Sequence, residues 1–360
     1  MFKRNSRILT IELLIIMFIG LLMIYSASSV WAEYKFKDQF YFVKRQFIFM
    51  IVGLVIMQLM TRIDLNKIRG YIKPLFIISI ISLILVLIPG IGIEKNGSRS
   101  WFGFGSFSVQ PSEFFKIIAI IYISDYLAKR NHIRSFIKDL LVPACVCGIG
   151  FILILLQPDF GSGIVMCCSL VIIVLVADAP IKYFIRVGMV SIVGLVGLII
   201  SAPYRLARIT SFINPWADPL GSGFQIIQSL FSIGPGGILG VGLGNSTQKH
   251  FYLPEPHTDF IFAIYAEEMG FIGCILLIGL YILIIYEGIK IAKSCESSYM
   301  MYIAMGLIAL FAIQVMINLG VVVGLFPVTG ITLPLCSYGG SSLVVMLGAM
   351  GLIESIANQK

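Results

Sequence analysis

The sequence predicts an all-α polytopic membrane protein, and three observations support this fold class. Hydrophobic residues make up 58% of the 360 residues, and charged residues make up only 12%. The mean hydropathy of +0.98 is higher than the core of a water-soluble protein of this length requires. Apolar runs of about 20 residues, the length that crosses a bilayer as a helix, recur along the chain between short polar segments.

We place ten transmembrane helices in these runs and expect residues 1–360 to form a single transmembrane domain. The spans are expected at 10–31, 44–61, 74–93, 111–128, 139–157, 161–178, 183–202, 260–287, 299–325 and 338–357. The first run follows three basic residues and resembles a secretory signal peptide in that respect. Its length and the lack of a clear small-residue cleavage site predict a retained helix instead.

The distribution of positive charge predicts the orientation. Most of the 26 lysines and arginines fall in segments 1–9, 62–73, 129–139, 178–186 and 288–298 and in the C-terminal tail. Short loops of this kind are typical of cytoplasmic faces, and an even number of spans places both termini there. The net charge of +8 therefore indicates topology and not a nucleic-acid partner. The seven cysteines lie mostly in apolar stretches, so we expect neither disulfides nor a zinc site.

Segment 203–259 is a long external loop in a chain whose other connections are short. It holds six of the 14 prolines and the Gly-Pro-Gly-Gly run at 234–237, so it cannot form one continuous helix. Phe224, Ile227 and Phe231 repeat at helical spacing, with Gln225, Gln228 and Ser232 between them. This pattern predicts a short helix in the membrane interface, although a helix that packs on the bundle fits equally well.

Asp259 is the last charged residue before the apolar run that begins the eighth span. We therefore expect its carboxylate where water and hydrocarbon meet, a position that is costly for a charge. Burial against Phe260, Ile261 and Phe262 would raise its pKa above the ordinary value of about 3.9. From the residues alone, a carboxylate that merely pairs with a nearby arginine is an equally good interpretation.

A series of separated motifs resembles the SEDS family (shape, elongation, division and sporulation), whose members include FtsW, RodA and SpoVE. These motifs are Asn96 to Trp101, Gln110 to Glu113, Gln157-Pro158-Asp159, Asn214-Pro215-Trp216, Gly221 to Gln225, Gly234 to Gly237, Tyr252 to Phe262, Pro327 to Gly330 and Ser337 to Ser342. They follow in order over almost the whole chain, which makes the set far more specific than any single motif. The short termini and loops are most similar to the SpoVE and FtsW branch.

The resemblance implies a ten-helix fold and a peptidoglycan glycosyltransferase in the bacterial cytoplasmic membrane. Such an enzyme polymerises lipid II on the external face, in division or sporulation, beside a class B penicillin-binding transpeptidase and other membrane proteins of the same machinery. It also implies that Asp259, in its His-Thr-Asp-Phe motif, is the catalytic residue. A general base that accepts the proton of the attacking sugar hydroxyl is chemically consistent with this role.

Candidate substrate-binding residues lie on the external side. The cations suited to a diphosphate are Arg45, Arg99, Arg205, Arg208 and Lys249. Arg45 comes first, because it lies at membrane depth and the resemblance implies a function for it; an arginine that snorkels to the interface is the alternative. Glu255 and His257 lie near Asp259, and ordinary loop polarity explains His257 better than a direct role.

Several other polar residues have both a functional and a structural interpretation. Glu113 and Lys116 are one helical turn apart and predict an ion pair, either in the substrate cavity or purely structural. Trp101 could stack on a sugar or anchor the interface. Asp159 is expected to form a turn or cap a helix, and at least one of Glu267 and Glu268 to face the cavity or a partner charge.

Two other functions remain open at this point. A lipid II flippase would need polar residues through the full membrane depth, whereas the central thirds of most spans are apolar, with Gln314 and Asn318 the chief exceptions. A non-catalytic scaffold would not explain the dense polar motifs on the external side. No cofactor is required by the sequence, and a magnesium or manganese ion that bridges Asp259 and the diphosphate is an alternative without a ligand cluster to demand it.

Overall fold

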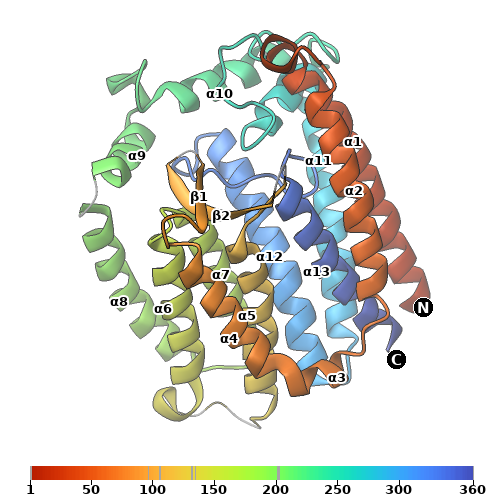
Figure 1. Ribbon diagram of the computed structural model, residues 1–360, viewed down its shortest axis with the longest axis vertical. Helices are drawn as coiled ribbons and strands as arrows, with labels where there is room; N and C mark the ends of the chain where they lie inside the picture. Colours follow the sequence, from red (N-terminus) through yellow and green to blue (C-terminus); the bar gives the residue numbers. More distant parts are fainter. Residues whose placement is uncertain are drawn as a thin grey trace.

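The structure, a computed structural model, describes residues 2–95, 97–104, 107–130, 133, 135–200 and 203–359. Long helices run between two ends of the molecule (Figure 1). The bundle helices are α1 (Phe2–Phe36), α2 (Tyr41–Met60), α4 (Ile72–Leu85), α5 (Pro111–Ala128), α6 (Leu141–Leu155), α7 (Phe160–Val176), α8 (Ile181–Ile200), α11 (Ile261–Lys293), α12 (Ser298–Val322) and α13 (Gly340–Asn358). Each of these lies at one of the ten expected spans.

Length and composition make most of these helices candidates for crossing a membrane. In the described part of the chain, seven helical segments meet both criteria, and α7 is apolar but shorter. The helix α5 carries the charged residues Glu113, Lys116 and Asp125, two of which pair with each other inside the bundle. The polytopic membrane fold predicted from the sequence is therefore confirmed.

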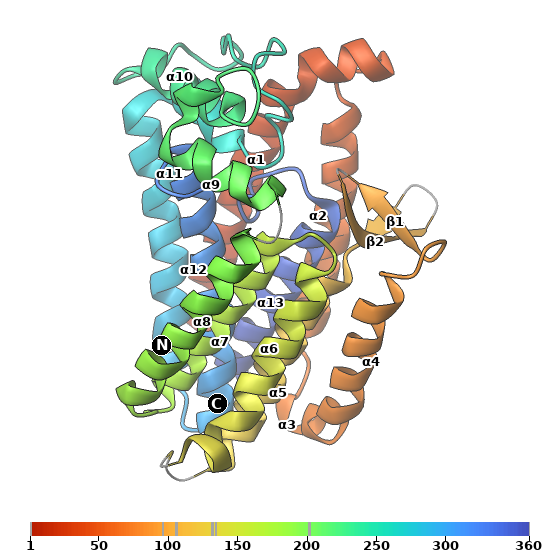
Figure 2. The same ribbon diagram turned by 90° about the vertical axis from the view of Figure 1, so that its left-hand side faces the viewer.

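The third span differs from the prediction. We expected a helix to residue 93, but α4 ends at Leu85, because Pro89 and Gly90 break the run. The chain then forms a small antiparallel sheet of β1 (Gly92–Lys95), β2 (Ser98–Phe104) and β3 (Phe107–Val109) in the order β1-β2-β3. The predicted helical fold thus also contains a small sheet in this connection, which Figure 2 shows beside α2 and above α4.

Short helices complete the connections. They are α3 (Leu65–Ile68), the 3₁₀ helix η1 (Arg69–Tyr71), the π-helix η2 (Phe136–Leu140), α9 (Pro203–Ile213), the 3₁₀ helix η3 (Pro215–Ala217) and α10 (Phe224–Gly236). Asp64 accepts a hydrogen bond from the amide of Asn66 and caps α3. The helices of segment 203–259 confirm that it is not one continuous helix.

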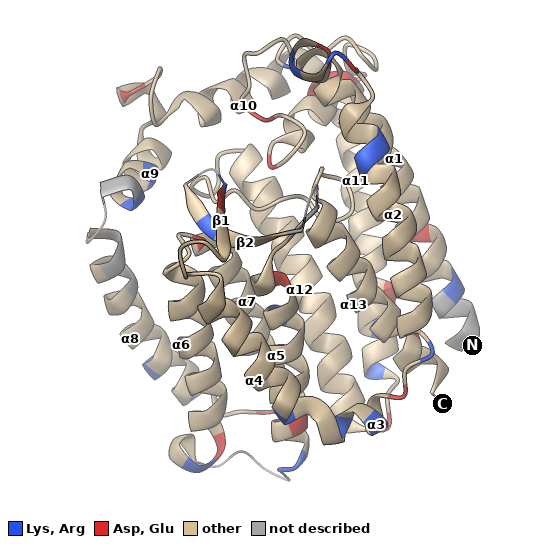
Figure 3. Cartoon of the chain, viewed as in Figure 1, with Lys and Arg blue, Asp and Glu red and all other residues tan. Residues whose placement is uncertain are grey.

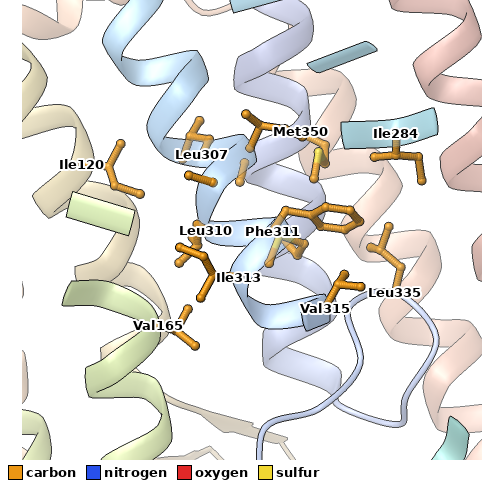
Figure 4. Close-up of a cluster of buried hydrophobic side chains, with 14 of the residues drawn as sticks. Ile120, Val165, Ile284, Leu307, Leu310, Phe311, Ile313, Val315, Leu335 and Met350 are labelled. Atoms are coloured by element: carbon orange, nitrogen blue, oxygen red, sulfur yellow. The ribbon is translucent and has the colours of Figure 1, made fainter. Parts of the chain in front are cut away.

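The core is built around α12, which packs against α5, α7, α11 and α13. Figure 4 shows Leu307, Leu310 and Phe311 of this helix among side chains of the neighbouring helices. Phe311 is fully buried. The polar side chains Gln314 and Asn318 of α12 are buried, so they are removed from lipid and solvent and need partners inside the protein.

The helix α10 lies across one end of the bundle (Figure 1). The predicted short helix is thus present, and Ile227 is buried while Phe231 is about half exposed. Ser232, expected on the polar side, is buried and donates to the carbonyl of Ala263. The helix therefore packs on the bundle with one face and leaves an apolar face, which includes Phe231, exposed.

The helix α11 is interrupted at Gly270, where φ is +64°. A Cβ atom at this position would lie 2.2 Å from the amide nitrogen of Gly240, so only glycine fits. The segment after α10 fills the interruption: the amide of Phe271 donates to the carbonyl of Gly237, and the amide of Val241 donates to the carbonyl of Glu267. The backbone groups freed by the break are thereby satisfied, as a membrane interior requires.

Charged residues gather at the two ends of the bundle, and the helices between are mostly uncharged (Figure 3). Both termini lie toward the end opposite to α10 (Figure 1). This arrangement agrees with the even number of spans.

Candidate active site

Asp259 lies in the turn that connects the long segment 203–259 to α11. Its carboxylate is partly buried and accepts a hydrogen bond of 2.8 Å from the hydroxyl of Thr258. The same hydroxyl is 2.8 Å from the carbonyl of Glu255, which also accepts the amide of Thr258. The turn is therefore held by short local contacts, and the second carboxylate oxygen is left for other partners.

Burial raises the pKa of Asp259 to about 6. The negative charge of Glu255 acts in the same direction, whereas the Thr258 hydrogen bond and the positive Arg208 act against it. A carboxylate with this pKa is ionised at neutral pH and is a stronger base than an ordinary aspartate, which suits general base catalysis. The pKa increase expected from the sequence is thus present.

His257 lies among aromatic rings and not in a polar site. Its ring centroid is 4.2 Å from that of Phe42, 5.7 Å from that of Tyr338 and 6.0 Å from that of Trp31. Burial lowers the pKa of His257 to about 4, so the imidazole is neutral at physiological pH. Its carbonyl accepts the amide of Tyr338 at 2.9 Å. This placement favours a packing role over contact with substrate.

Arg45 lies on α2 and faces the same group of residues. Its guanidinium carbon is 4.4 Å from the ring centroid of Tyr41, and the guanidinium hydrogen-bonds Tyr338. In the described part of the chain, no carboxylate lies within ion-pair distance of Arg45. Partial burial, and next the positive charge of Arg45, lower the pKa of Lys95 on β1. These two neighbouring cations are candidates to bind an anion.

The helix α2 also fixes the loop between α12 and α13, residues 323–339. Buried Gln46 donates to the carbonyl of Ser337 at 3.1 Å and accepts the amide of Gly339 at 3.3 Å. Tyr338 therefore has its backbone held from α2 and from the turn of His257. Through this loop the structure brings Arg45 and the Asp259 turn into one connected site.

An apolar cavity of about 570 Å³ opens between α7, α9, α12 and the α12–α13 loop. Its lining includes Ile164, Ile317 and Pro327, with Arg205 and Arg208 from α9. Arg208 donates a hydrogen bond of 3.1 Å to the carbonyl of Val328 and is the nearby positive charge that acts on Asp259. Arg208 is therefore common to the cavity wall and to the electrostatic surroundings of Asp259.

The sheet carries two further candidates. Arg99 forms an exposed ion pair of 3.5 Å with Glu94, and the Lys95 ammonium lies 5.0 Å from the ring centroid of Trp101. Exposed ion pairs contribute little energy, so Arg99 can exchange Glu94 for another anion. Trp101 therefore lies near Lys95, on the Arg45 side of the site, and is not part of the cavity wall that contains Arg208.

Glu113 and Lys116 form the expected ion pair, with 2.7 Å between Glu113 Oε1 and Lys116 Nζ, and both side chains are buried. Asp159 caps α7, because its Oδ1 accepts the amide of Ser162 at 3.1 Å. Its other oxygen accepts Gln110 at 2.7 Å, and Lys116 and Glu113 both act on its charge. These groups form one buried network beneath the sheet, which fits the structural interpretation of the pair.

Lys249 is buried, and its ammonium interacts with groups away from Asp259. Its ammonium contacts the carbonyl of Gly244 and lies 3.5 Å from Glu268 Oε1. Glu268 thus faces a partner charge, as expected for at least one of the two glutamates. Glu267 accepts the hydroxyls of Ser232 and Ser246 and the amide of Thr247. Lys249 contributes to this cluster and not to the surroundings of Asp259.

The comparisons with known proteins decide the family. A family model for FtsW, RodA and SpoVE proteins, described as "Cell cycle protein", matches residues 6–360. The chain belongs to the FtsW/RodA/SpoVE family. It is 50% identical over 351 residues to stage V sporulation protein E of Bacillus subtilis (strain 168), which covers 97% of this chain and 96% of that protein. It is 42% identical to the probable peptidoglycan glycosyltransferase FtsW of Trichlorobacter lovleyi, over 94% of this chain and 89% of that protein.

Solved structures of the FtsW/RodA/SpoVE family agree with the fold. A structure described as "Structural coordination of polymerization and crosslinking by a peptidoglycan synthase complex" matches with a TM-score of 0.80 and 31% identity, over 97% of this chain and 96% of the other. The rod shape determining protein RodA of Thermus thermophilus matches with a TM-score of 0.72 and 28% identity, over 97% and 95%. The SEDS resemblance inferred from the motifs is therefore confirmed.

Three residues near the candidate site were not among the sequence-based candidates. Lys95 precedes the Asn96–Trp101 motif, Tyr338 lies within the Ser337–Ser342 motif, and Asn318 was noted only as a polar exception in its span. The Ser337–Ser342 motif carried the signal for Tyr338, and Lys95 directly adjoins a motif. Their contacts depend on how α2 meets the α12–α13 loop, which no local pattern reveals.

The described residues hold no group of three or more His, Cys, Asp or Glu side chains that could bind a metal ion. Asp259 has Glu255 as an electrostatic neighbour and Thr258 as a hydrogen-bond donor. Any bridging cation would therefore depend on the oxygens of a bound diphosphate for most of its ligands.

Proposed function

We propose that this chain is a peptidoglycan glycosyltransferase that polymerises lipid II, the undecaprenyl-diphosphate-linked disaccharide pentapeptide, with Asp259 as general base. The observation that carries the proposal is the partly buried Asp259, its pKa raised to about 6, beside an apolar cavity whose wall contains Arg205 and Arg208. Family membership over residues 6–360 supports the same activity.

The reaction joins two lipid-linked sugars. The hydroxyl of one sugar attacks the anomeric carbon of the other and gives its proton to the Asp259 carboxylate. The bond between that carbon and the diphosphate oxygen breaks, and the diphosphate leaves with the electron pair. Guanidinium groups stabilise the leaving charge, since their planar fork matches phosphate oxygens.

The site offers cations in two places, which suits a reaction with two lipid-linked substrates. Arg205 and Arg208 border the apolar cavity, where part of a polyprenyl chain would be accommodated. Arg45 and Lys95, with Arg99 and Trp101 nearby on the sheet, lie on the α2 side. We propose that each group holds one diphosphate and that Asp259 acts between them.

The two polar residues that could have favoured a flippase have structural roles. Gln314 and Asn318 were the polar exceptions in otherwise apolar spans, and both donate to backbone carbonyls of the α12–α13 loop. Both side chains hold this loop near Asp259. They do not form part of a polar path across the bundle. A scaffold role would not require an isolated carboxylate with a raised pKa.

The test uses purified protein, lipid II and the partner transpeptidase, with Asp259→Asn as the variant. The amide keeps the size of the side chain but cannot accept the proton, and loss of a general base costs about 100- to 10,000-fold in rate. We expect the variant to bind lipid II and make essentially no glycan polymer. Headgroup translocation across vesicles is measured in parallel. Wild-type polymer formation by Asp259→Asn would disprove the base assignment, and a defect in translocation alone would favour a flippase.

For the location, we propose the bacterial cytoplasmic membrane with both termini in the cytoplasm and the Asp259 end outside. The basic loops at the end of the termini support this orientation. Single cysteines at two exposed positions test it in an otherwise cysteine-free protein: Tyr252→Cys should react with an impermeant reagent in intact cells, and Lys138→Cys should not. Labelling at both would contradict the topology and the external site together.

We also propose that a class B penicillin-binding transpeptidase is the partner, together with other division or sporulation membrane proteins. Co-purification from membranes with that transpeptidase tests this. The bridging magnesium or manganese ion stays a prediction. Polymerisation in the presence of a chelator, with either ion added back, distinguishes a required ion from a dispensable one.

A further inference from the structure

Asn318 is a buried amide on the central helix α12, and the proposed chemistry leaves it without a role. Its side chain is 1% exposed. Its neighbours Ile317 and Val321 are apolar core residues. An amide removed from water is costly unless its hydrogen-bonding groups find partners.

The amide nitrogen of Asn318 finds its two partners in irregular backbone. Nδ2 donates to the carbonyl of Asp259 at 2.7 Å and to the carbonyl of Ile331 at 2.7 Å. An amide nitrogen carries two hydrogens, so both donors are used. Flipping the amide would turn its oxygen toward two carbonyl oxygens, so the orientation is fixed. One side chain therefore connects α12, the Asp259 turn and the α12–α13 loop.

This connection acts at the residue that carries the proposed base. The carbonyl and the carboxylate of Asp259 branch from the same Cα atom, so fixing the carbonyl restricts the directions in which the carboxylate can point. The carboxylate itself accepts a hydrogen bond from the adjacent Thr258 hydroxyl, which moves with the turn. A misplacement of about 1 Å can cost on the order of 100-fold in rate.

We propose that Asn318 is a positioning residue that holds Asp259 in its working place by fixing its backbone carbonyl to α12 and the α12–α13 loop. This inference rests on the proposed role of Asp259 as the base. Asn318 itself does not contact the reacting atoms.

Gln314 provides a matched control. It lies one helical turn earlier on α12, is buried as well, and donates to the carbonyl of Thr332 at 3.4 Å. It therefore contacts the same loop from the same helix. This hydrogen bond does not involve the Asp259 turn. Removing either amide removes a hydrogen bond to the α12–α13 loop. Only the removal of the Asn318 amide also removes the hydrogen bond to the carbonyl of Asp259.

The experiment compares Asn318→Leu and Gln314→Leu in the full-length protein, with lipid II polymerisation measured across pH. We expect Asn318→Leu to lower kcat roughly 100-fold with little change in KM. The acidic limb of its pH profile should move to lower pH, because a loosened carboxylate gains water and its pKa falls. Gln314→Leu should lose less activity and keep the limb in place.

A second variant covers the case in which Asn318→Leu is not recovered folded. Asn318→Ser is smaller and keeps one donor, and it should show the same direction of shift with a smaller loss of kcat. An acidic limb that stays in place or moves upward in these variants, with a loss no larger than that of Gln314→Leu, overturns the positioning role.

Asp259→Glu separates this inference from the proposed function. If the acidic limb of the pH–rate profile does not shift in Asp259→Glu, the limb does not report the titration of Asp259. This result would contradict the base assignment itself. A limb that responds to Asp259→Glu but not to the Asn318 variants contradicts only the positioning of Asp259 by Asn318.

Discussion

Two carboxylate sites lie two helical turns apart in this chain, and their surroundings differ. Glu267 accepts three hydrogen bonds, from Ser232, Ser246 and the amide of Thr247. Asp259 accepts one side-chain hydrogen bond, from the adjacent Thr258, and burial raises its pKa to about 6. Both carboxylates are removed from bulk water, but only the first has its acceptor capacity filled by the protein.

The difference indicates how to separate structural from reactive carboxylates in such a bundle. Glu267 and Glu268 attach the segment after α10 to the interrupted helix α11, and their partners hold them in one arrangement. The backbone carbonyl of Asp259 accepts a hydrogen bond from Asn318, and the positive charge of Arg208 acts on its carboxylate. A carboxylate fixed by its main chain with an unfilled side chain is suited to accept a proton from substrate.

The largest expected effect tests the structural side of this comparison. Lys249→Met leaves the buried Glu268 without its cation, and breaking a buried ion pair costs about 3–5 kcal/mol. We expect a clear decrease in the thermal unfolding temperature in detergent. The double variant Lys249→Met with Glu268→Gln removes the stranded charge and should regain part of the stability. A single variant as stable as the parent would mean that this cluster does not hold the fold.

The pH dependence tests the reactive side. The base must be ionised to accept a proton, so activity is retained above the Asp259 pKa and lost as the pH falls through about 6. Well below that value polymerisation should decrease about tenfold per pH unit, which amounts to about 50-fold between pH 6 and pH 4. The measurement is the initial rate in matched buffers with the fold monitored by circular dichroism. A flat rate down to pH 4 would remove the distinction between the two carboxylate sites.

Arg45→Lys asks whether the cations near Asp259 act on substrate. Lysine keeps the positive charge but lacks the planar, two-pronged guanidinium group of arginine. Complete loss of one charge-assisted hydrogen bond costs about 1.5–3 kcal/mol. We expect roughly a tenfold decrease in polymerisation at equal membrane abundance, since lysine retains part of the interaction. Lys44→Gln is the matched control, because Lys44 forms an exposed ion pair with Asp38. Equal rates for Arg45→Lys and the wild type would assign Arg45 to the interface alone.

The smallest expected effect is a shift of the acidic limb in Thr258→Val. The Thr258 hydroxyl stabilises the ionised carboxylate, so its removal should raise the Asp259 pKa and move the limb to higher pH. A single hydrogen bond of this kind corresponds to about 0.5–1 pH unit. This direction is opposite to that expected for Asn318→Leu. The same sign in both variants would show that the limb does not report on the Asp259 carboxylate.

Much of the fold could be predicted from the sequence, because membrane spans and turns are local properties. Each expected span lies on an observed helix, and the break in segment 203–259 follows from its prolines. The sheet at 92–109 was not predicted, since its strands are short and rich in turn residues. The interruption of α11 at Gly270 was also not predicted, because a glycine within an apolar run is common and its backbone angle depends on the segment packed against it.

The candidate site was predicted in part. Asp259 was found because a charge at the start of an apolar run is unusual, and the Glu113–Lys116 pair because helical spacing places the two residues together. Lys249 seemed equal to Arg208 in sequence, as both are cations of one external loop. Folding buries Lys249 against Glu268 and leaves Arg208 at the cavity, and this difference arises from where α9 and the segment after α10 pack.

The sequence by itself determined the membrane class, the number and order of spans, the family motifs and the position of Asp259 at a span boundary. These depend on hydrophobicity along the chain and on residue types in sequence order. The tertiary structure alone decided which polar groups are satisfied and which remain available. Asn318 reaches Asp259 across 59 positions and Arg45 meets Tyr338 from another helix, and such contacts are set by how distant segments pack together.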